Sequence, residues 1–204
     1  MDNNLFTRYP TLTVCRDDIE ASIKMLEKVF YSGGRLYVCG NGGSAADALH
    51  IVGELAKSFV LSRPLDKDFM ENINDAELRE NLQGALPAFP LVENVALSSA
   101  FSNDANSEFI FAQQVYAYAR KGDCVLGIST SGNSKNIINA LKTAKGREAY
   151  TIGLTGQGGG EMKTLCNCCI CVPETETYLV QELHLPIYHA MCLELEKTFF
   201  GVIE

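Results

Sequence analysis

Hydrophobic and polar positions along the chain follow two periods, which predict alternating helices and strands. Near the N-terminus, apolar residues recur every three to four positions, as on one face of an amphipathic helix. These residues are Ile19, Ile23, Leu26 and Phe30. About the first 30 residues are therefore predicted to be helical. The glycine pair after Ser32 is a typical signal for the end of a helix.

Short apolar runs predict buried strands. They cover residues 35–39, 124–128, 149–154 and 166–172. Helices are predicted at residues 44–59, 107–120, 135–144 and 178–200, the last one long and C-terminal. Because strands alternate with helices, we expect an α/β fold with a parallel sheet that is covered by helices on both faces.

Residues 61–88 interrupt this alternation. They combine Leu-Ser-Arg-Pro, a charged stretch that is expected to be helical, and a closing Gly-Ala-Leu-Pro. We interpret them as an excursion inserted at the surface of a single domain that spans residues 1–204. A chain of 204 residues is long enough for one such domain with a full hydrophobic core.

The composition argues against some classes of binding partner. With 47% hydrophobic and 21% charged residues, the chain resembles an ordinary globular protein. Its formal net charge of −8 argues against binding nucleic acid, because such an interface needs a basic face. No apolar run approaches the roughly 20 residues of a membrane helix, and no secretory leader is recognised. We therefore expect a cytoplasmic protein without membrane contact.

The chain contains eight cysteines, which are expected to be thiols because disulfides are rare in cytosolic proteins. Four of them lie close together, at positions 166, 168, 169 and 171. Two interpretations compete, a zinc knuckle and a buried strand that uses cysteine as a small hydrophobic residue. The spacing lacks paired Cys-x-x-Cys motifs, and an extended segment would divide the thiols between its two faces, so the strand is favoured.

Two Gly- and Ser-rich turns follow predicted strands, at residues 40–44 and 129–134. In a parallel sheet such turns lie at the carboxyl edge, where ligands bind. The second turn places four hydroxyl groups before a helix N-terminus, and together these can hold a phosphate. Neither turn matches the nucleotide P-loop or the dinucleotide-binding pattern. The residues alone leave two interpretations of the second turn open, a site for a small phosphate and simple capping of the helix.

All three histidines lie in two short motifs. His50 precedes Glu54 by four residues, so both side chains project from one face of a helix. On the C-terminal helix, Gln181 and His189 are near neighbours on one face, with His184 to the other side. If the two helices meet, these groups can bind zinc, or act as general base (Glu54) and general acid (His189). A lone helical histidine usually only packs or hydrogen-bonds at the surface, so this interpretation depends on their joint placement.

Four motifs, in the same order along the chain, resemble those of the SIS (sugar isomerase) family and of its phosphoheptose isomerases in particular. They are residues 39–48, 102–104, 127–134 and 181–189. The resemblance spans about residues 14–199. It implies a three-layer αβα sandwich around a five-stranded parallel sheet, and a homotetramer with active sites at the contacts between subunits.

The resemblance also implies roles for individual residues. Glu54 and His189 would be the catalytic acid–base pair, and zinc, where present, would be held by His50, Glu54, Gln181 and His189. The substrate would be lined by Asn41, Gly42, Gly43, Asn103, Asp104 and Gln181, and its phosphate held by Ser129, Thr130, Ser131 and Ser134. The implied reaction is the aldose–ketose interconversion of sedoheptulose 7-phosphate and D-glycero-D-manno-heptose 7-phosphate through an enediol.

An alternative function stays open. Some proteins that resemble this family do no chemistry, and instead bind the replication initiator protein or sense a sugar phosphate. The presence of both Glu54 and His189 favours the enzyme. The chain departs from the family pattern at Ser58, where arginine is usual, and in the long stretch 64–89.

Overall fold

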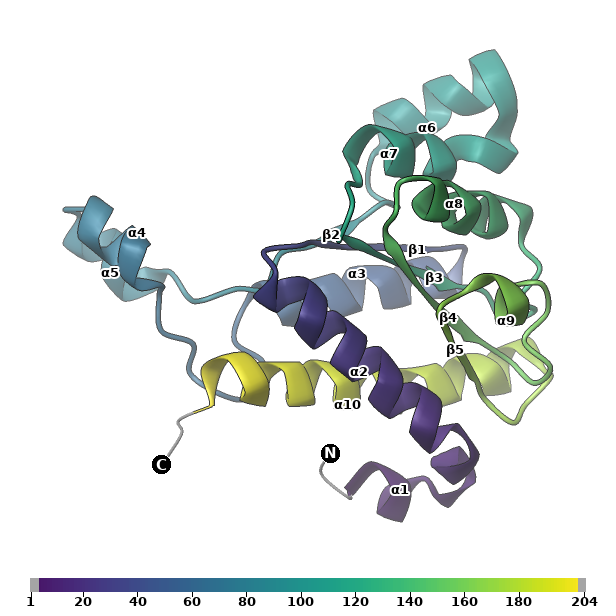
Figure 1. The fold of residues 1–204 in the computed structure, drawn as a ribbon, viewed down its shortest axis with the longest axis horizontal. Coiled ribbons are helices and arrows are strands. Elements are labelled where there is room, and N and C mark those ends of the chain that lie inside the picture. The colour runs from purple at the N-terminus through teal and green to yellow at the C-terminus, as the bar shows by residue number, and fades with distance from the viewer. Residues whose placement is uncertain (1–3, 202–204) are drawn as a thin grey trace.

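The computed structural model describes residues 4–201 and is organised around one sheet (Figure 1). All five strands are parallel, in the order β2-β1-β3-β4-β5. Their bounds are Leu36–Gly40 (β1), Ala88–Pro90 (β2), Cys124–Ile128 (β3), Tyr150–Thr155 (β4) and Cys168–Cys171 (β5). The predicted α/β sandwich with a five-stranded parallel sheet is confirmed.

Helices cover both faces of the sheet (Figure 1). One face packs against α2 (Arg16–Tyr31), α3 (Gly43–Ala56) and α10 (Thr177–Phe200), and the other against α7 (Ile110–Tyr118) and α8 (Lys135–Gly146). In β1, Leu36 and Val38 join the first apolar core, whereas Tyr37 and Cys39 join the second. Burial on both faces explains why the central strands are continuous apolar runs.

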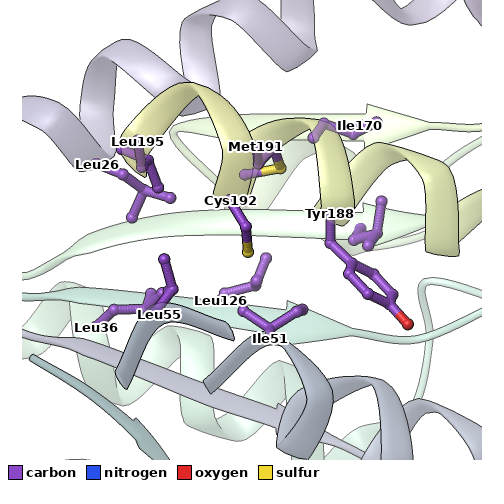
Figure 2. Close-up of a pocket in the computed structure, with 11 residues that line it drawn as sticks. Leu26, Leu36, Ile51, Leu55, Leu126, Ile170, Tyr188, Met191, Cys192 and Leu195 are labelled. Carbon is purple, nitrogen blue, oxygen red and sulfur yellow. The ribbon is translucent and has the colours of Figure 1, made fainter. Parts of the chain in front are cut away.

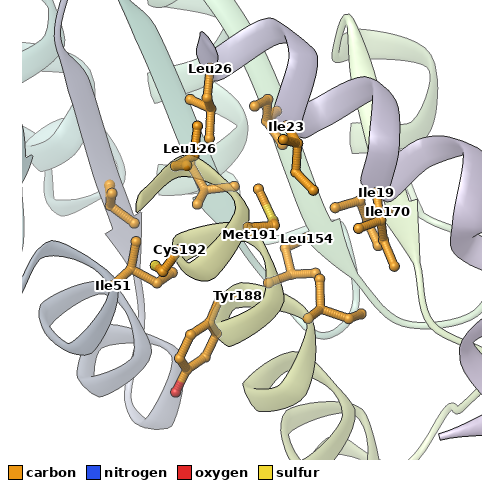
Figure 3. Packing of buried hydrophobic residues seen from close by; sticks show 14 of the residues in the cluster. Ile19, Ile23, Leu26, Ile51, Leu126, Leu154, Ile170, Tyr188, Met191 and Cys192 are labelled. Carbon is orange, nitrogen blue, oxygen red and sulfur yellow. The ribbon is translucent and has the colours of Figure 1, made fainter. Parts of the chain in front are cut away.

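The larger core lies between the sheet, α2 and α10 (Figure 3). Ile19 and Leu26 of α2 are at most 1% exposed and share this core with Leu154 of β4 and Met191 of α10. Fully burying one such side chain stabilises the fold by roughly 1.5–3 kcal/mol. This packing fixes α10 against the sheet, and α10 carries two of the candidate site residues, Gln181 and His189.

The N-terminal helix is not continuous, so the prediction for the first 30 residues is corrected. The chain forms α1 (Asn4–Arg8), a 3-10 helix η1 (Pro10–Cys15) and then α2. Pro10 stands at the first position of η1. Proline has no backbone N–H and its ring clashes with the preceding turn of an α-helix, so α1 cannot continue through it.

Residues 61–88 leave the body of the molecule only after Arg63, which is buried, and return to it at the buried Leu86, just before the edge strand β2. Within them, α4 (Lys67–Asn72) and α5 (Ala76–Asn81) stand apart from the other helices in Figure 1, and neither contains a buried residue. The return leads into β2, which pairs with β1. The residue patterns did not predict β2, because it has only three residues and ends at Pro90.

The remaining elements are short. They are α6 (Val95–Phe101), the π-helical turn η2 (Ser102–Asn106), the 3-10 turn η3 (Ser107–Phe109) and α9 (Met162–Leu165). The helix predicted at residues 107–120 thus begins with η3 and continues as α7. Among the described residues, the helices are too short or too polar to cross a bilayer.

The cysteine-rich segment is the edge strand β5, as the favoured interpretation predicted. Cys168 Sγ contacts the Ser22 hydroxyl at 3.2 Å and the Asp18 carbonyl at 3.1 Å, both on α2. Cys169 belongs to the core on the opposite face, with Cys171 Sγ 3.9 Å from its thiol. The thiols are therefore divided between the two faces of the strand, and all eight cysteines of the chain are free.

Candidate active site

Two turns at the carboxyl edge of the sheet meet at the candidate site. The first follows β1, and Gly42 there has a φ of 54°, a left-handed conformation that favours glycine. Gly43 begins α3 with the Gln181 side chain pressed against it, since a Cβ at Gly43 would lie 2.7 Å from Gln181 Nε2. The start of α10 is therefore seated directly on the glycine turn.

The second turn follows β3 and leads into α8. Ser129 Oγ donates to Ser134 Oγ at 2.9 Å, and the Asn133 backbone N–H donates to Ser131 Oγ at 3.2 Å. Ser134 is the N-cap of α8, yet its side chain makes no capping hydrogen bond. The hydroxyls are thus gathered beside a helix N-terminus that they do not cap. This arrangement favours the phosphate site over simple capping.

The two turns are tied together by a pair of amides. Asn41 Nδ2 donates to Asn136 Oδ1 at 2.9 Å, and Asn136 Nδ2 donates back to Asn41 Oδ1 at 2.8 Å. Thr130 sits at the back of the second turn, where its carbonyl accepts from the Gly156 N–H at 3.0 Å. Asn136 was not predicted as a site residue, because only the fold brings the first turn of α8 next to the turn that follows β1.

His50, Glu54 and His189 converge where α3 meets α10. His50 Nε2 lies 3.3 Å from Glu54 Oε1 and 3.4 Å from His189 Nε2. The two imidazole rings are nearly perpendicular, at 82°, with their centroids 4.9 Å apart. Lys57 Nζ donates to the other carboxylate oxygen of Glu54 at 2.6 Å. The two helices do meet, so the groups that the sequence placed on separate helices lie within reach of one small ligand.

Tyr188 and Asp47 orient His50 through the Nδ1 atom of its ring. Tyr188 Oη lies 3.1 Å from His50 Nδ1 and donates to Asp47 Oδ1 at 3.2 Å. Burial raises the pKa of Asp47, and burial together with Asp47 raises the pKa of Tyr188. Tyr188 therefore stays protonated at neutral pH. Neither residue was singled out in the sequence, where Tyr188 is one of several apolar positions on the C-terminal helix.

The pKa of His189 is lowered, so that its imidazole can act as an uncharged hydrogen-bonding group. Burial lowers its pKa, His50 lowers it further, and Glu54 acts in the opposite direction. At neutral pH the imidazole is therefore uncharged. A neutral imidazole can donate one N–H to a substrate oxygen and accept a proton at the other nitrogen.

Tyr188 also closes the end of an apolar gap between α3, α10 and the sheet (Figure 2). Its hydroxyl points away from the aliphatic side chains that line this gap, among them Ile51 and Met191. The gap encloses only about 10 Å³. An apolar void of this size stays dry and holds no ligand, so it belongs to the core rather than to the site.

The donors suit zinc only in part. The His50–His189 and His50–Glu54 distances both match the edge of a tetrahedron around an ion with bonds of about 2.0–2.1 Å. Within residues 4–201, however, no three His, Cys, Asp or Glu side chains form a complete metal site. Gln181 lies two helical turns from His189 and contacts Gly43 instead. His50 therefore has both neighbours, His189 and Glu54, at a suitable spacing, but the described side chains do not form a complete ligand set.

Three further residues of the sequence motifs lie apart from this cluster. Asn103 and Asp104 are exposed on η2, where Asn103 Nδ2 donates to Asp104 Oδ1 at 2.8 Å. His184 is fully buried, and in the described part of the chain neither ring nitrogen has a hydrogen-bond partner. Burial lowers the pKa of His184 to about 4, which the nearby Thr155 backbone only partly offsets. His184 is thus a neutral core residue and not part of the reactive cluster.

Comparison with known proteins defines the class. Two models of the SIS domain match residues 11–85 and 98–194. With the parallel sheet and the two turns at its carboxyl edge, these matches show that the chain belongs to the SIS-domain family.

Within that family the chain belongs to the phosphoheptose isomerases, which are aldose–ketose isomerases. It is 40% identical to phosphoheptose isomerase 2 of Campylobacter jejuni over 89% of this chain and 80% of that protein. The solved phosphoheptose isomerase of Francisella tularensis superposes with a TM-score of 0.79 at 30% identity, covering 93% of this chain and 91% of that one. The enzyme from Neisseria gonorrhoeae superposes with a TM-score of 0.72 at 28% identity, over 96% and 98%.

Proposed function

We propose that the chain interconverts sedoheptulose 7-phosphate and D-glycero-D-manno-heptose 7-phosphate in the cytoplasm. The observation that carries this proposal is the cluster of His50, Glu54 and His189, in a chain that belongs to the phosphoheptose isomerases. The cytoplasmic location is supported by eight unpaired cysteines, which suit a reducing compartment.

The geometry supports separate roles for residues at the phosphate end and at the reacting end of the substrate. The turn Ser129–Ser134 and the N-terminus of α8 would bind the phosphate through hydroxyl and backbone N–H donors. Glu54 would move the proton between C1 and C2, with Lys57 and His50 holding its carboxylate. His189, being neutral, would donate its N–H to the oxygen that becomes negative in the enediolate.

A direct assay tests the proposal. Sedoheptulose 7-phosphate is incubated with the protein in heavy water, and the products are followed by NMR. Formation of the aldose 7-phosphate with deuterium at C2 supports an enediol route, because the base exchanges its proton with solvent. Fructose 6-phosphate serves as the shorter control substrate. The proposal would be contradicted if the seven-carbon sugar gave no aldose product even at enzyme concentrations near those of the substrate.

Zinc is proposed as a partner of the same cluster, held by His50, Glu54, Gln181 and His189. Its chemistry there would be to polarise the substrate carbonyl. The imidazole spacing supports this ligand set, and Glu54 or Gln181 would have to move to complete it. Because an imidazole bound to metal is a poor proton carrier, Glu54 is the residue expected to carry the proton.

The zinc content of the purified protein tests this ligand set. We expect about one zinc per chain by elemental analysis, and its loss in the His50→Ala, His189→Ala double variant. A Cys166→Ser, Cys169→Ser variant is the matched control, because thiols are the other zinc donors in the chain. Protein that contains no zinc after growth with zinc, or that loses it only in the cysteine variant, would contradict the assignment.

A second prediction concerns the phosphate turn. Replacing Ser131 and Ser134 together by Ala is expected to raise KM at least tenfold, because hydrogen bonds to a charged group contribute about 1.5–3 kcal/mol each. The unfolding free energy should change little, since Ser134 does not cap α8. Steady-state kinetics and inhibition by inorganic phosphate measure the effect. The exposed Ser32, which bonds only to its own helix, provides the control Ser32→Ala. An unchanged KM would contradict the role of the turn.

We also propose a homotetramer with active sites at subunit contacts. Asn103 and Asp104 support this arrangement, because both are exposed in a single chain and their expected role as substrate-lining residues needs a partner surface.

A further inference from the structure

A cavity lies at the β2 edge of the sheet, between β1, β2 and the C-terminal end of α7. It encloses about 360 Å³, within the range of roughly 300–1,000 Å³ typical of small-molecule sites. Arg35, which directly precedes β1, and Arg120, which follows α7, are on its wall. Leu91 and Asn94, which follow β2, line it as well, so the cavity runs along the β2 edge of the sheet, and no residue of the candidate active site lines it.

Aromatic rings supply flat surfaces in this cavity. Phe89 of β2 stacks on Tyr37 of β1 with centroids 5.7 Å apart and the planes at 29°. Phe89 is nevertheless 44% exposed, and Tyr118 at the end of α7 is 43% exposed. The Tyr37 hydroxyl donates to the Tyr118 carbonyl at 3.2 Å, which holds the two walls together. Partly exposed rings on a fixed frame offer faces on which another aromatic ring can stack.

The buried carboxylate of Asp123 holds the backbones of Arg35 and Arg120 beside this cavity. Asp123 is 6% exposed and accepts the Arg35 backbone N–H at 2.9 Å and the Arg120 backbone N–H at 2.8 Å. The Arg35 guanidinium lies 6.0 Å from the centre of the Phe89 ring. Among the described residues neither arginine forms an ion pair with a carboxylate. The Asp123 carboxylate offsets one of these two positive charges, and the remaining positive charge beside the cavity favours an anion.

Amide groups complete the lining. Gln114 is 1% exposed, and its Nε2 donates to the Leu91 carbonyl at 2.8 Å. Asn94 Nδ2 lies 3.4 Å from Tyr118 Oη. Gln114 Nε2 also donates to the Ile110 carbonyl at 3.3 Å, and Asn94 Oδ1 accepts from the Leu97 N–H at 3.1 Å. These amides therefore fix the walls of the cavity, while the aromatic rings and the arginines offer the groups for a ligand.

We propose that this cavity binds a nucleotide, with the base stacked on Phe89 and Tyr118 and the phosphate on Arg35 and Arg120. A planar base uses the aromatic faces, and a phosphate accepts paired hydrogen bonds from guanidinium groups. A free phosphate would leave the rings unused, and a nucleoside would leave the arginines unused. The site is separate from the phosphate turn at Ser129–Ser134 and is independent of the proposed isomerase reaction.

Calorimetric titration of the full chain tests the proposal, with the 5′-monophosphates of adenosine, guanosine, cytidine and uridine as probes. At least one nucleotide is expected to bind with a submillimolar Kd, tenfold or more tighter than its nucleoside or inorganic phosphate. The Arg35→Gln, Arg120→Gln double variant should weaken this binding at least tenfold. Arg16→Gln is the matched control, because Arg16 also lies over an aromatic ring, Phe6, but on the other side of the sheet.

A fluorescence experiment provides a second, local readout. The chain has no tryptophan, so Phe89→Trp introduces a single fluorophore and keeps an aromatic face in the cavity. Nucleotide is expected to quench its emission with the calorimetric Kd. Binding of every nucleotide weaker than a few millimolar would overturn the proposal. So would binding that survives in the double arginine variant but is lost in the Ser131→Ala, Ser134→Ala variant, since the nucleotide would then occupy the phosphate turn.

Discussion

Glu54→Gln is expected to lower kcat for the isomerisation by about a thousandfold, because a positioned general base contributes roughly 10²–10⁴ to a proton transfer. The amide has the shape of the carboxylate but cannot accept the proton from the substrate carbon. KM should stay within a few fold, since the phosphate and the sugar hydroxyls keep their partners. Progress curves followed by NMR give both constants.

The control for this variant is another glutamate paired with lysine. Glu148 accepts from Lys121 at 2.7 Å on the surface, as Glu54 accepts from Lys57, so Glu148→Gln removes a comparable ion pair far from the site. It should leave kcat unchanged. Solvent deuterium exchange at C2 separates the roles further, because it should fall by the same factor as kcat in Glu54→Gln. Exchange at the original rate would show that another group is the base.

The fold was predictable where burial leaves a clear pattern. The central strands β1, β3 and β4 are buried on both faces, so each is a short apolar run between polar turns. The edge strand β2 leaves no such pattern, since Phe89 is exposed and Pro90 ends it after three residues. It pairs with β1 only because the chain returns there after residues 61–88.

The contacts of the site could be predicted where the residues are close together in the sequence. The i, i+4 spacing places His50 and Glu54 together on any helix, and the structure gives 3.3 Å between them. The approach of His189 depends on how α3 and α10 pack, which no local pattern contains. The family motifs supplied that contact. Tyr188 and Asn136 had no signal at all, because each gains its role only from a partner far away in sequence.

Glu196→Gln is expected to lower the free energy of unfolding by about 3–5 kcal/mol, because it leaves a buried charge without its partner. The Glu196 carboxylate accepts backbone N–H groups of Phe59, Val60 and Leu61 at 2.7–3.0 Å and Arg63 Nε at 2.7 Å. Both charged side chains are at most 1% exposed. Chemical denaturation at pH 7 measures the loss.

The variant that removes both charges is the control. Glu196→Gln combined with Arg63→Gln should be more stable than Glu196→Gln alone, because no unpaired charge stays buried and both amides can still hydrogen-bond to the backbone groups of this cluster. If the double variant is less stable than the single one, the loss in Glu196→Gln does not come from the buried, unpaired charge of Arg63.

The pH dependence of this loss follows from the pKa of Glu196. Burial raises that pKa, but the three backbone N–H donors and Arg63 outweigh burial and lower it below the usual value. A lowered folded-state pKa stabilises the fold above the unfolded pKa of about 4.3, and this contribution disappears as the pH falls through the folded value. The stability gap between the wild-type chain and Glu196→Gln should therefore be full at pH 7 and narrow below about pH 4.

The same ion pair is connected to the backbone of Glu54, the residue that carries the reactive carboxylate. Arg63 Nη2 donates to the Glu54 carbonyl at 2.8 Å and Arg63 Nη1 to the Leu55 carbonyl at 2.7 Å, so Arg63 holds the last turn of α3. In Glu196→Gln that turn loses its anchor on α10. The folded fraction of this variant should therefore show a reduced kcat with a nearly unchanged KM. A stable variant with full kcat would show that α3 holds Glu54 in place without Arg63.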